Sequence, residues 1–288
     1  MEKYTHKINC PGCGGEHLSL FIHGQDFHRY DSQEFGSREK LTKVRPTFLK
    51  CQACQLLVAQ NKIDPSFFQN KVREGAYQEQ SIERYAARTY FNLIKGYIRP
   101  DQFSLEVGCS GGEFMRLLNS PNLFGVEPNR AAYNSMPLLL QKQVSNDFLE
   151  NYFEEKKANG ELESFANIFS FQIMEHHLDI ERDLHCIQKL LHHKGQLFLV
   201  LHNYDAFINR LLGESSPVYE YQHRVVFHPK SIEIFLSRMG FEIVQMRSIV
   251  NFYPVSYAFS LLQKEYHLGL DPLIPFPTGN LFVRAIKR

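Results

Sequence analysis

Residues 105–114 read LEVGCSGGEF, and this stretch says more about the fold than any other part of the chain. Leu105 and Val107, on either side of Glu106, belong to a short predicted strand, and the small residues at 108–112 predict a tight turn. A helix is expected to follow from Glu113. Small side chains let the backbone approach a ligand closely, beside the positive end of the helix dipole. The stretch therefore predicts a ligand-binding turn between a strand and a helix.

A second acidic segment follows at the spacing that a nucleoside site requires. Residues 124–129 read FGVEPN, and Glu127 stands twenty-one positions after Glu106. A carboxylate at the end of this second strand can accept hydrogen bonds from both hydroxyls of a ribose. The sequence contains neither the G-x-G-x-x-G fingerprint of dinucleotide sites nor a G-x-x-x-x-G-K-[ST] phosphate loop. Together the two segments indicate an adenosine-type cofactor rather than NAD or ATP.

Strand-like and helix-like segments alternate on both sides of this pair. The expected strands span residues 103–107, 123–126, 166–172, 195–202, 241–250 and 281–286. The expected helices span residues 113–118, 179–191, 204–212 and 230–239, and an earlier one covers about 78–98. Such alternation predicts an α/β fold of the Rossmann-like, doubly wound kind, in which helices cover both faces of a largely parallel sheet.

Two C-x-x-C motifs stand near the N-terminus, at Cys10 and Cys13 and at Cys51 and Cys54, with 37 residues between them. Each motif presents two sulfurs to one point, and two motifs complete a tetrahedral thiolate site for Zn²⁺. Four thiolates leave no open position on the metal, so the predicted zinc is structural. Two unrelated reduced pairs, or one redox-active pair, are the alternatives. The pattern favours a small zinc-ribbon-like module.

The amino-acid composition limits the binding partners and the cellular location that can be expected. The 288 residues include 32 basic and 31 acidic side chains, and the formal net charge is +1. A chain so balanced has no long-range field that steers it to nucleic acid or to an anionic membrane. The sequence has no apolar run long enough for a membrane span and no apolar signal-peptide core, and six cysteines fit a metal site or free thiols. We therefore expect a cytoplasmic protein that binds neither nucleic acid nor membrane.

These motifs resemble those of the class I S-adenosylmethionine-dependent methyltransferases. LEVGCSGGEF is similar to motif I of that family, and FGVEPN is similar to its second motif. Residues 169–179, FSFQIMEHHLD, resemble the segment after the family's fourth strand, which commonly ends in Leu-Glu-His. The resemblance covers about residues 63–288. It implies a helical connector that caps the cofactor at 63–100 and a methyltransferase domain at 101–288, after the zinc-binding module that the cysteine motifs predict at 1–62.

The same resemblance implies a set of residues that bind S-adenosylmethionine. Glu106 would lie near the methionine amino group, and Glu127, followed by Pro128, would hold the ribose diol. Asp147 would contact the adenine amine, and Gln172 would close the floor of the site. The remaining members line the methionine and ribose, and they are Gly108, Ser110 and Gly112.

The methyl acceptor is expected at the carboxyl ends of the strands, where histidines gather. Paired C-x-x-C motifs before such a domain resemble the sugar C-methyltransferases of deoxysugar biosynthesis, which use a Glu-His pair after strand four and a later Tyr-x-Glu-His cluster. Glu175 and His176 match the first, so the implied catalytic residues are Glu175, His176 and His223. Of the Tyr-x-Glu-His cluster only the terminal histidine, His223, is present, because Gln222 stands in place of the glutamate. Those enzymes also continue into a further C-terminal domain.

The acceptor therefore stays open between a nucleotide-sugar and another small metabolite, methylated on carbon, oxygen or nitrogen. An RNA-modifying methyltransferase is one alternative, but residues 1–60 hold only eight basic against six acidic side chains. A non-catalytic binding protein is the other, and the intact cofactor motifs argue against it. The aromatic- and proline-rich residues 253–277 are expected either to cover the acceptor pocket or to pack on the sheet.

Overall fold

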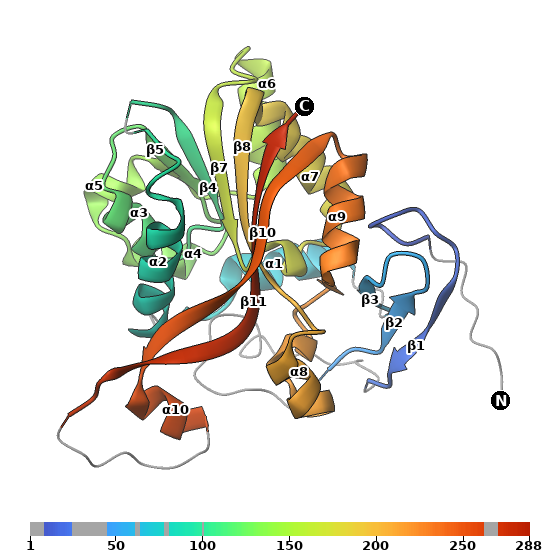
Figure 1. Ribbon diagram of the computed structural model, residues 1–288. Coiled ribbons are helices and arrows are strands. Elements are labelled where there is room, and N and C mark those ends of the chain that lie inside the picture. Colours follow the sequence, from blue (N-terminus) through green and yellow to red (C-terminus); the bar gives the residue numbers. More distant parts are fainter. Residues whose placement is uncertain (1–8, 25–44, 61–63, 78–80, 100, 262–269) are drawn as a thin grey trace.

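Two sheets organise the computed structural model, which describes residues 9–24, 45–60, 64–77, 81–99, 101–261 and 270–288 (Figure 1). The larger sheet has seven strands in the order β10-β11-β8-β7-β4-β5-β6. Its strands are β4 (Ser104–Val107), β5 (Leu123–Val126), β6 (Val144–Ser145), β7 (Phe165–Phe171), β8 (Leu191–His202), β10 (Phe241–Pro254) and β11 (Leu273–Lys287). Strands β4 to β8 are parallel, whereas β11 runs antiparallel to both β8 and β10.

Helices cover both faces of this sheet because its central strands are apolar on both sides. In β8, for example, Leu197, Leu199 and Leu201 point to one face, and Phe198 and Val200 point to the other. The first face packs against α6 (Leu149–Ala158), α7 (Ile180–Leu190) and α9 (Pro229–Arg238). The second packs against α2 (Ser81–Ile94) and α3 (Glu113–Leu118). None of the described helices has the length and apolar character of a membrane span.

The strand order confirms the doubly wound prediction. From β4 the chain goes outward to β5 and β6, and then crosses back to β7 on the other side of β4. Such a reversal leaves a crevice at the carboxyl ends of the strands, where ligands of α/β proteins bind. The remaining helices are α1 (Pro65–Glu74), α4 (Arg130–Ser135), α5 (Leu138–Gln141), α8 (Phe207–Leu212) and α10 (Val255–Leu261).

The smaller sheet joins the N-terminal residues to the rest of the chain. It contains β1 (Leu18–Ile22), β2 (Phe48–Cys51), β3 (Leu57–Ala59) and β9 (Val225–Val226), in that order. Its fourth strand, β9, lies far along the sequence from the other three. The proposed division at residues 62–63 and 100–101 stays a prediction, since residues 61–63 and 100 lie outside those described.

The described part of residues 253–277 consists of the ends of β10 and β11 and of α10. Strands β10 and β11 extend beyond the end of β8 as a two-stranded arm, in which Tyr253 pairs with Ile274. Helix α10 follows β10 at the end of this arm (Figure 1). Tyr253 packs edge-to-face against Tyr257, with ring centroids 5.0 Å apart. Residues 262–269 of this segment lie outside the described part.

Candidate active site

A cavity of about 820 Å³ opens at the carboxyl ends of β4, β5, β7 and β8. Helices α1 and α2 contribute Phe68 and Tyr90 to its wall. Most of the predicted site residues line it, and they are Glu106, Gly108, Ser110, Glu127, Pro128, Gln172, His176 and His223. None of the described residues of 253–277 does so. The cavity therefore brings together residues from both the predicted cofactor set and the predicted catalytic set.

The Glu127 carboxylate is held by backbone amides at both of its oxygens. Oε2 accepts a hydrogen bond of 2.8 Å from the Ser110 N–H, and Oε1 accepts one of 2.8 Å from the Asn129 N–H. Burial raises the pKa of Glu127 to about 7, although both amides act in the opposite direction. A carboxylate oriented this way keeps lone pairs for a vicinal diol, which is the recognition expected of a ribose.

Glu106 supplies a second carboxylate whose hydrogen bonding is incomplete. Its side chain is buried, and Oε2 has no hydrogen-bond partner among the described residues. Burial and the neighbouring Glu113 and Glu127 raise its pKa well above the ordinary value. An acceptor left this way in a buried site fits a ligand that brings a cationic donor, such as the ammonium group of S-adenosylmethionine.

The turn after β4 requires glycine at position 108. Gly108 has φ of +72°, and a Cβ atom built there would lie 2.5 Å from the Ile173 side chain, in the loop after β7. The Gly108 backbone, just after β4, therefore packs directly against the Ile173 side chain, just after β7. This close approach shapes the part of the cavity that the motif I resemblance assigns to the methionine of the cofactor.

We expect Gly108→Ala to lower the free energy of unfolding by about 2–4 kcal/mol and to weaken S-adenosylmethionine binding at least about tenfold. Strain at positive φ and the clash with Ile173 both contribute. Gly160→Ala is the matched control, because Gly160 has the same φ of +72° with no neighbour within 4 Å of the added Cβ. Denaturant unfolding and calorimetry measure the two effects. Equal losses in both variants would show that the contact with Ile173 is unimportant.

Two predicted cofactor residues lie outside the cavity lining. Asp147 Oδ1 accepts hydrogen bonds of 2.8 Å from Arg73, from the Phe148 N–H and from Asn151. Its neighbour Phe148 lines the cavity in its place. Gly112 faces α5, where an added Cβ would lie 2.4 Å from Leu140. The contact of Asp147 with adenine and that of Gly112 with the cofactor stay predictions.

Three further residues of the cavity lining, His176, His202 and His223, form a cluster of histidine rings. The ring centroids of His176 and His223 are 4.8 Å apart, and those of His202 and His223 are 5.1 Å apart. His223 Nδ1 lies 2.9 Å from the Val218 carbonyl, which can only accept, so Nδ1 carries the proton and Nε2 is a free acceptor. His202 Nδ1 donates in the same way to Asn280 Oδ1 at 2.9 Å.

The cluster is neutral at physiological pH. Burial lowers the pKa of His223 to about 4, and burial together with His223 lowers that of His202 to about 3. Burial and the three neighbouring histidines lower the pKa of His176 as well. The adjacent His177 behaves differently: burial lowers its pKa, but Asp183, whose Oδ2 lies 2.6 Å from its Nδ1, acts together with Glu175 and Glu150 to give a net rise. The three rings are therefore unprotonated, and each neutral ring keeps one nitrogen with a lone pair.

Glu175 lies behind the histidine cluster rather than in the cavity. It is fully buried, Oε1 accepts a hydrogen bond from the His202 N–H, and burial raises its pKa to about 7. Sequence reasoning gave no role to Asn280, which orients His202. The sequence did contain a signal for this role. An asparagine inside the mostly apolar segment GNLFVRAI of β11 needs a polar partner when it is buried.

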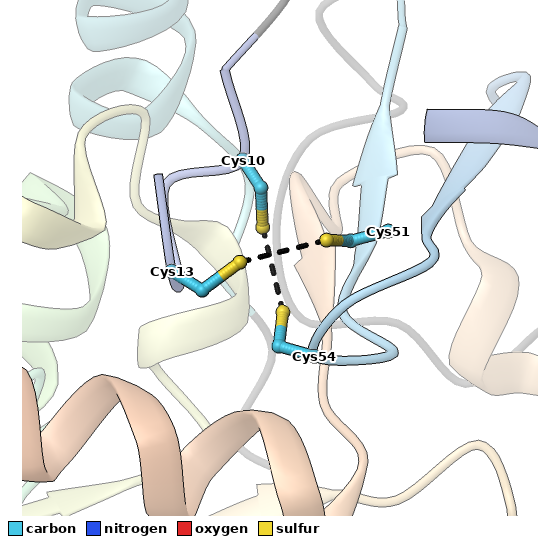
Figure 2. Close-up of side chains that lie close together, drawn as sticks. All are labelled: Cys10, Cys13, Cys51 and Cys54. Atoms are coloured by element: carbon cyan, nitrogen blue, oxygen red, sulfur yellow. Dashed lines mark hydrogen bonds between the residues drawn. The ribbon is translucent and has the colours of Figure 1, made fainter. Parts of the chain in front are cut away.

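The four predicted zinc ligands meet at a second site, at one edge of the smaller sheet. The Sγ atoms of Cys10, Cys13, Cys51 and Cys54 all lie within 4.8 Å of one another, with the four side chains converging as Figure 2 shows. Cys10 Sγ is 3.5 Å from Cys54 Sγ, and Cys13 Sγ is 3.6 Å from Cys51 Sγ. The Gly15 N–H donates to Cys13 Sγ. Four thiols around one point fit a tetrahedral Zn²⁺ site.

Comparisons with known proteins agree with the fold. Residues 77–246 match the model of a family described as a methyltransferase domain. A SAM-dependent methyltransferase of Archaeoglobus fulgidus superposes with a TM-score of 0.51 at 16% identity, covering 78% of this chain and 100% of that chain. One of Anabaena variabilis gives 0.49 at 16% identity, covering 83% and 100%. At such identities the superpositions show the fold alone, and no curated protein matches the chain.

The fold and the family match together define a class I S-adenosylmethionine-dependent methyltransferase. The chain belongs to the methyltransferase-domain family, whose model spans more than half of its length.

Proposed function

We propose that the enzyme transfers the methyl group of S-adenosylmethionine to a small-molecule acceptor and that a histidine of the cluster acts as general base. The observation that carries this proposal is the layout of the cavity. Glu127 and residues 108–110 of the turn after β4 line the same cavity as His176, His202 and His223. A bound cofactor and an acceptor in one cavity can be aligned for direct transfer.

The cofactor end offers a matched set of groups for S-adenosylmethionine, which supplies the methyl group when bound. Glu127 would accept hydrogen bonds from the ribose hydroxyls. Glu106, with its unpaired buried Oε2, would face the methionine ammonium group. Burial raises the pKa of both carboxyls, and the positive charge of the bound cofactor would favour their ionised forms.

At the acceptor end His223 is the proposed base. Its Nε2 can remove a proton from a hydroxyl, an amine or an acidic carbon while Val218 holds the opposite nitrogen. His176, with its ring 4.8 Å away, is the second candidate. Glu175 is proposed as a positioning residue, because its carboxylate holds the backbone of His202 and does not line the cavity.

Nucleotide-sugars are the first acceptors to screen, on the resemblance to the sugar C-methyltransferases, and other small metabolites follow. An RNA substrate would predict retention on heparin at moderate salt, and a non-catalytic protein would predict no binding of S-adenosylmethionine. We further propose that the four-cysteine site holds structural Zn²⁺. The cytoplasmic location stays a prediction from the sequence.

Calorimetric titration of S-adenosylmethionine tests the proposal. We expect one site of micromolar strength, weakened at least about tenfold, or about 1.4 kcal/mol, by Glu127→Ala, because the ribose loses its carboxylate. Glu233→Ala, at an exposed glutamate of α9, is the matched control and should bind like the wild type. Absence of binding in the folded, zinc-loaded wild type would overturn the methyltransferase proposal and favour the non-catalytic alternative.

A further inference from the structure

The segment that carries His223 is hydrogen-bonded to the four-cysteine site. Strand β9 begins two residues after His223 and pairs with β3, with Val225 opposite Val58 and Val226 opposite Leu57. The Ala59 N–H, at the end of β3, donates to the Arg224 carbonyl at 2.9 Å. Since β3 begins three residues after Cys54, the cysteine site and His223 are joined by a short, paired stretch of backbone.

A second contact runs from the same cysteine motif to the segment that carries His202. The Tyr204 hydroxyl donates to the Gln55 carbonyl at 2.7 Å. Gln55 directly follows Cys54, has φ of +72° and donates its own N–H to the Cys51 carbonyl. The closed shape of the cysteine turn therefore decides where this carbonyl points, and with it where Tyr204 is held.

A third link brings in the segment of His176. The Arg224 N–H donates to the Glu175 carbonyl at 2.6 Å, and Glu175 Oε1 accepts from the His202 N–H. All three segments that carry the histidine cluster thus meet at Arg224 or Tyr204, and both residues are held by the residues after Cys54. By contrast, the Glu127 carboxylate is held by Ser110 and Asn129, on the cofactor side.

Packing makes these links rigid. Cys10, Cys51, Cys54 and Leu56 belong to one buried cluster with residues of β8 and α9, including Leu201 and Phe235. Figure 2 shows the four cysteine side chains converging from two separate turns of the chain. Four sulfurs this close suit a metal ion as their common ligand set, and without the metal the sulfurs would be protonated thiols that no longer tie the two turns to one point.

We infer that the four-cysteine module is a positioning element of the acceptor site: the metal that closes it holds His223 in place through β3 and β9, and it leaves cofactor binding unaffected. The inference rests on the proposed function only for the role of His223. A module that served only as a docking surface or as a general stabiliser would not act selectively on one end of the cavity.

The first test removes the metal with a chelator under reducing conditions and restores it with Zn²⁺. We expect the ¹³C-labelled ring signal of His223, assigned with His223→Asn, to shift or broaden and to return with Zn²⁺. Backbone amides at 224–226 should exchange with solvent about tenfold faster, while S-adenosylmethionine affinity changes less than about twofold. An unchanged His223 signal after loss of the metal would overturn the inference.

A milder change covers the case in which removal of the metal unfolds the whole chain. Tyr204→Phe, in the zinc-loaded protein, deletes only the hydroxyl that donates to Gln55. Tyr152→Phe makes the same change at a buried tyrosine of α6 and serves as its control. We expect only Tyr204→Phe to shift the His223 signal and to speed exchange at 224–226. Equal behaviour of the two variants would contradict the inference, whereas loss of cofactor binding by the untreated wild type would contradict the proposed function alone.

Discussion

His223→Asn is expected to slow methyl transfer by about 10²- to 10⁴-fold and to leave S-adenosylmethionine binding unchanged. The asparagine amide can still donate to the Val218 carbonyl, as Nδ1 does in the wild type, but it has no counterpart of Nε2. The substitution therefore removes the base while keeping the fold of its loop. Transfer of a labelled methyl group to the acceptor found by screening, beside calorimetry, measures both quantities.

His185→Asn is the control for this change, since His185 is an exposed residue of α7. It should retain wild-type rates. If His223→Asn kept more than half of the wild-type rate, and His176→Asn lost it, the base would be His176 instead. If neither variant were slower, general base catalysis by the cluster would be wrong.

The pH profile gives an independent check on the same residue. A base works only in its unprotonated form, and burial lowers the pKa of His223 to about 4. Activity should therefore stay level from about pH 5 to 8 and fall only as the pH drops towards 4. With S-adenosylmethionine saturating, so that the ionisation of Glu127 does not enter, a loss of kcat centred near pH 6.5, the ordinary value for histidine, would show that the base is not in this buried cluster.

Cys51→Ala is expected to release the metal and to lower the free energy of unfolding by about 3–5 kcal/mol, or Tm by about 10 °C. The module is small, and a closed metal site replaces much of the hydrophobic core that it cannot build alone. Metal analysis and thermal unfolding measure the two effects. The matched control is Cys186→Ala, at a buried cysteine of α7 that lies outside the four-cysteine set.

Cys186→Ala should keep the metal and lose only about 1 kcal/mol, the cost of a small cavity. A Cys51→Ala protein that retained one equivalent of zinc and matched the Cys186→Ala stability would show that the four sulfurs do not form a structural metal site. The predicted zinc, and the positioning role inferred for it, would then both be wrong.

Local patterns were sufficient for the fold class and for the cofactor side of the cavity. The turn at 108–112 and the carboxylate at Glu127 follow directly from short stretches, because a strand, a tight turn and a helix are set by neighbouring residues. The expected strand 123–126 and helix 113–118 agree with β5 and α3 to the residue. Helix α6 was not predicted, although Leu149, Tyr152 and Phe153 share the spacing of one buried face.

The lengths of β10 and β11 could not be predicted from the local sequence. Pro254, Pro275 and Pro277 suggest breaks, yet both strands continue across them, to Pro254 in β10 and from Leu273 in β11. Each strand supplies hydrogen-bond partners to the other beyond the edge of the sheet. Pairing between distant segments therefore overrode a local preference.

The sequence by itself determined the α/β class, the tight turn at 108–112, the carboxylate of Glu127 at the end of the next strand, and the two C-x-x-C motifs. Only the tertiary structure decided which histidines meet. His176, His202 and His223 come from three separate segments, and they join because β8 and the loops before β9 converge on Glu175 and on the residues after Cys54. The physical reason is that short motifs are held by bonds between neighbours in sequence, whereas the histidine cluster depends on packing and strand pairing between residues that are far apart along the chain.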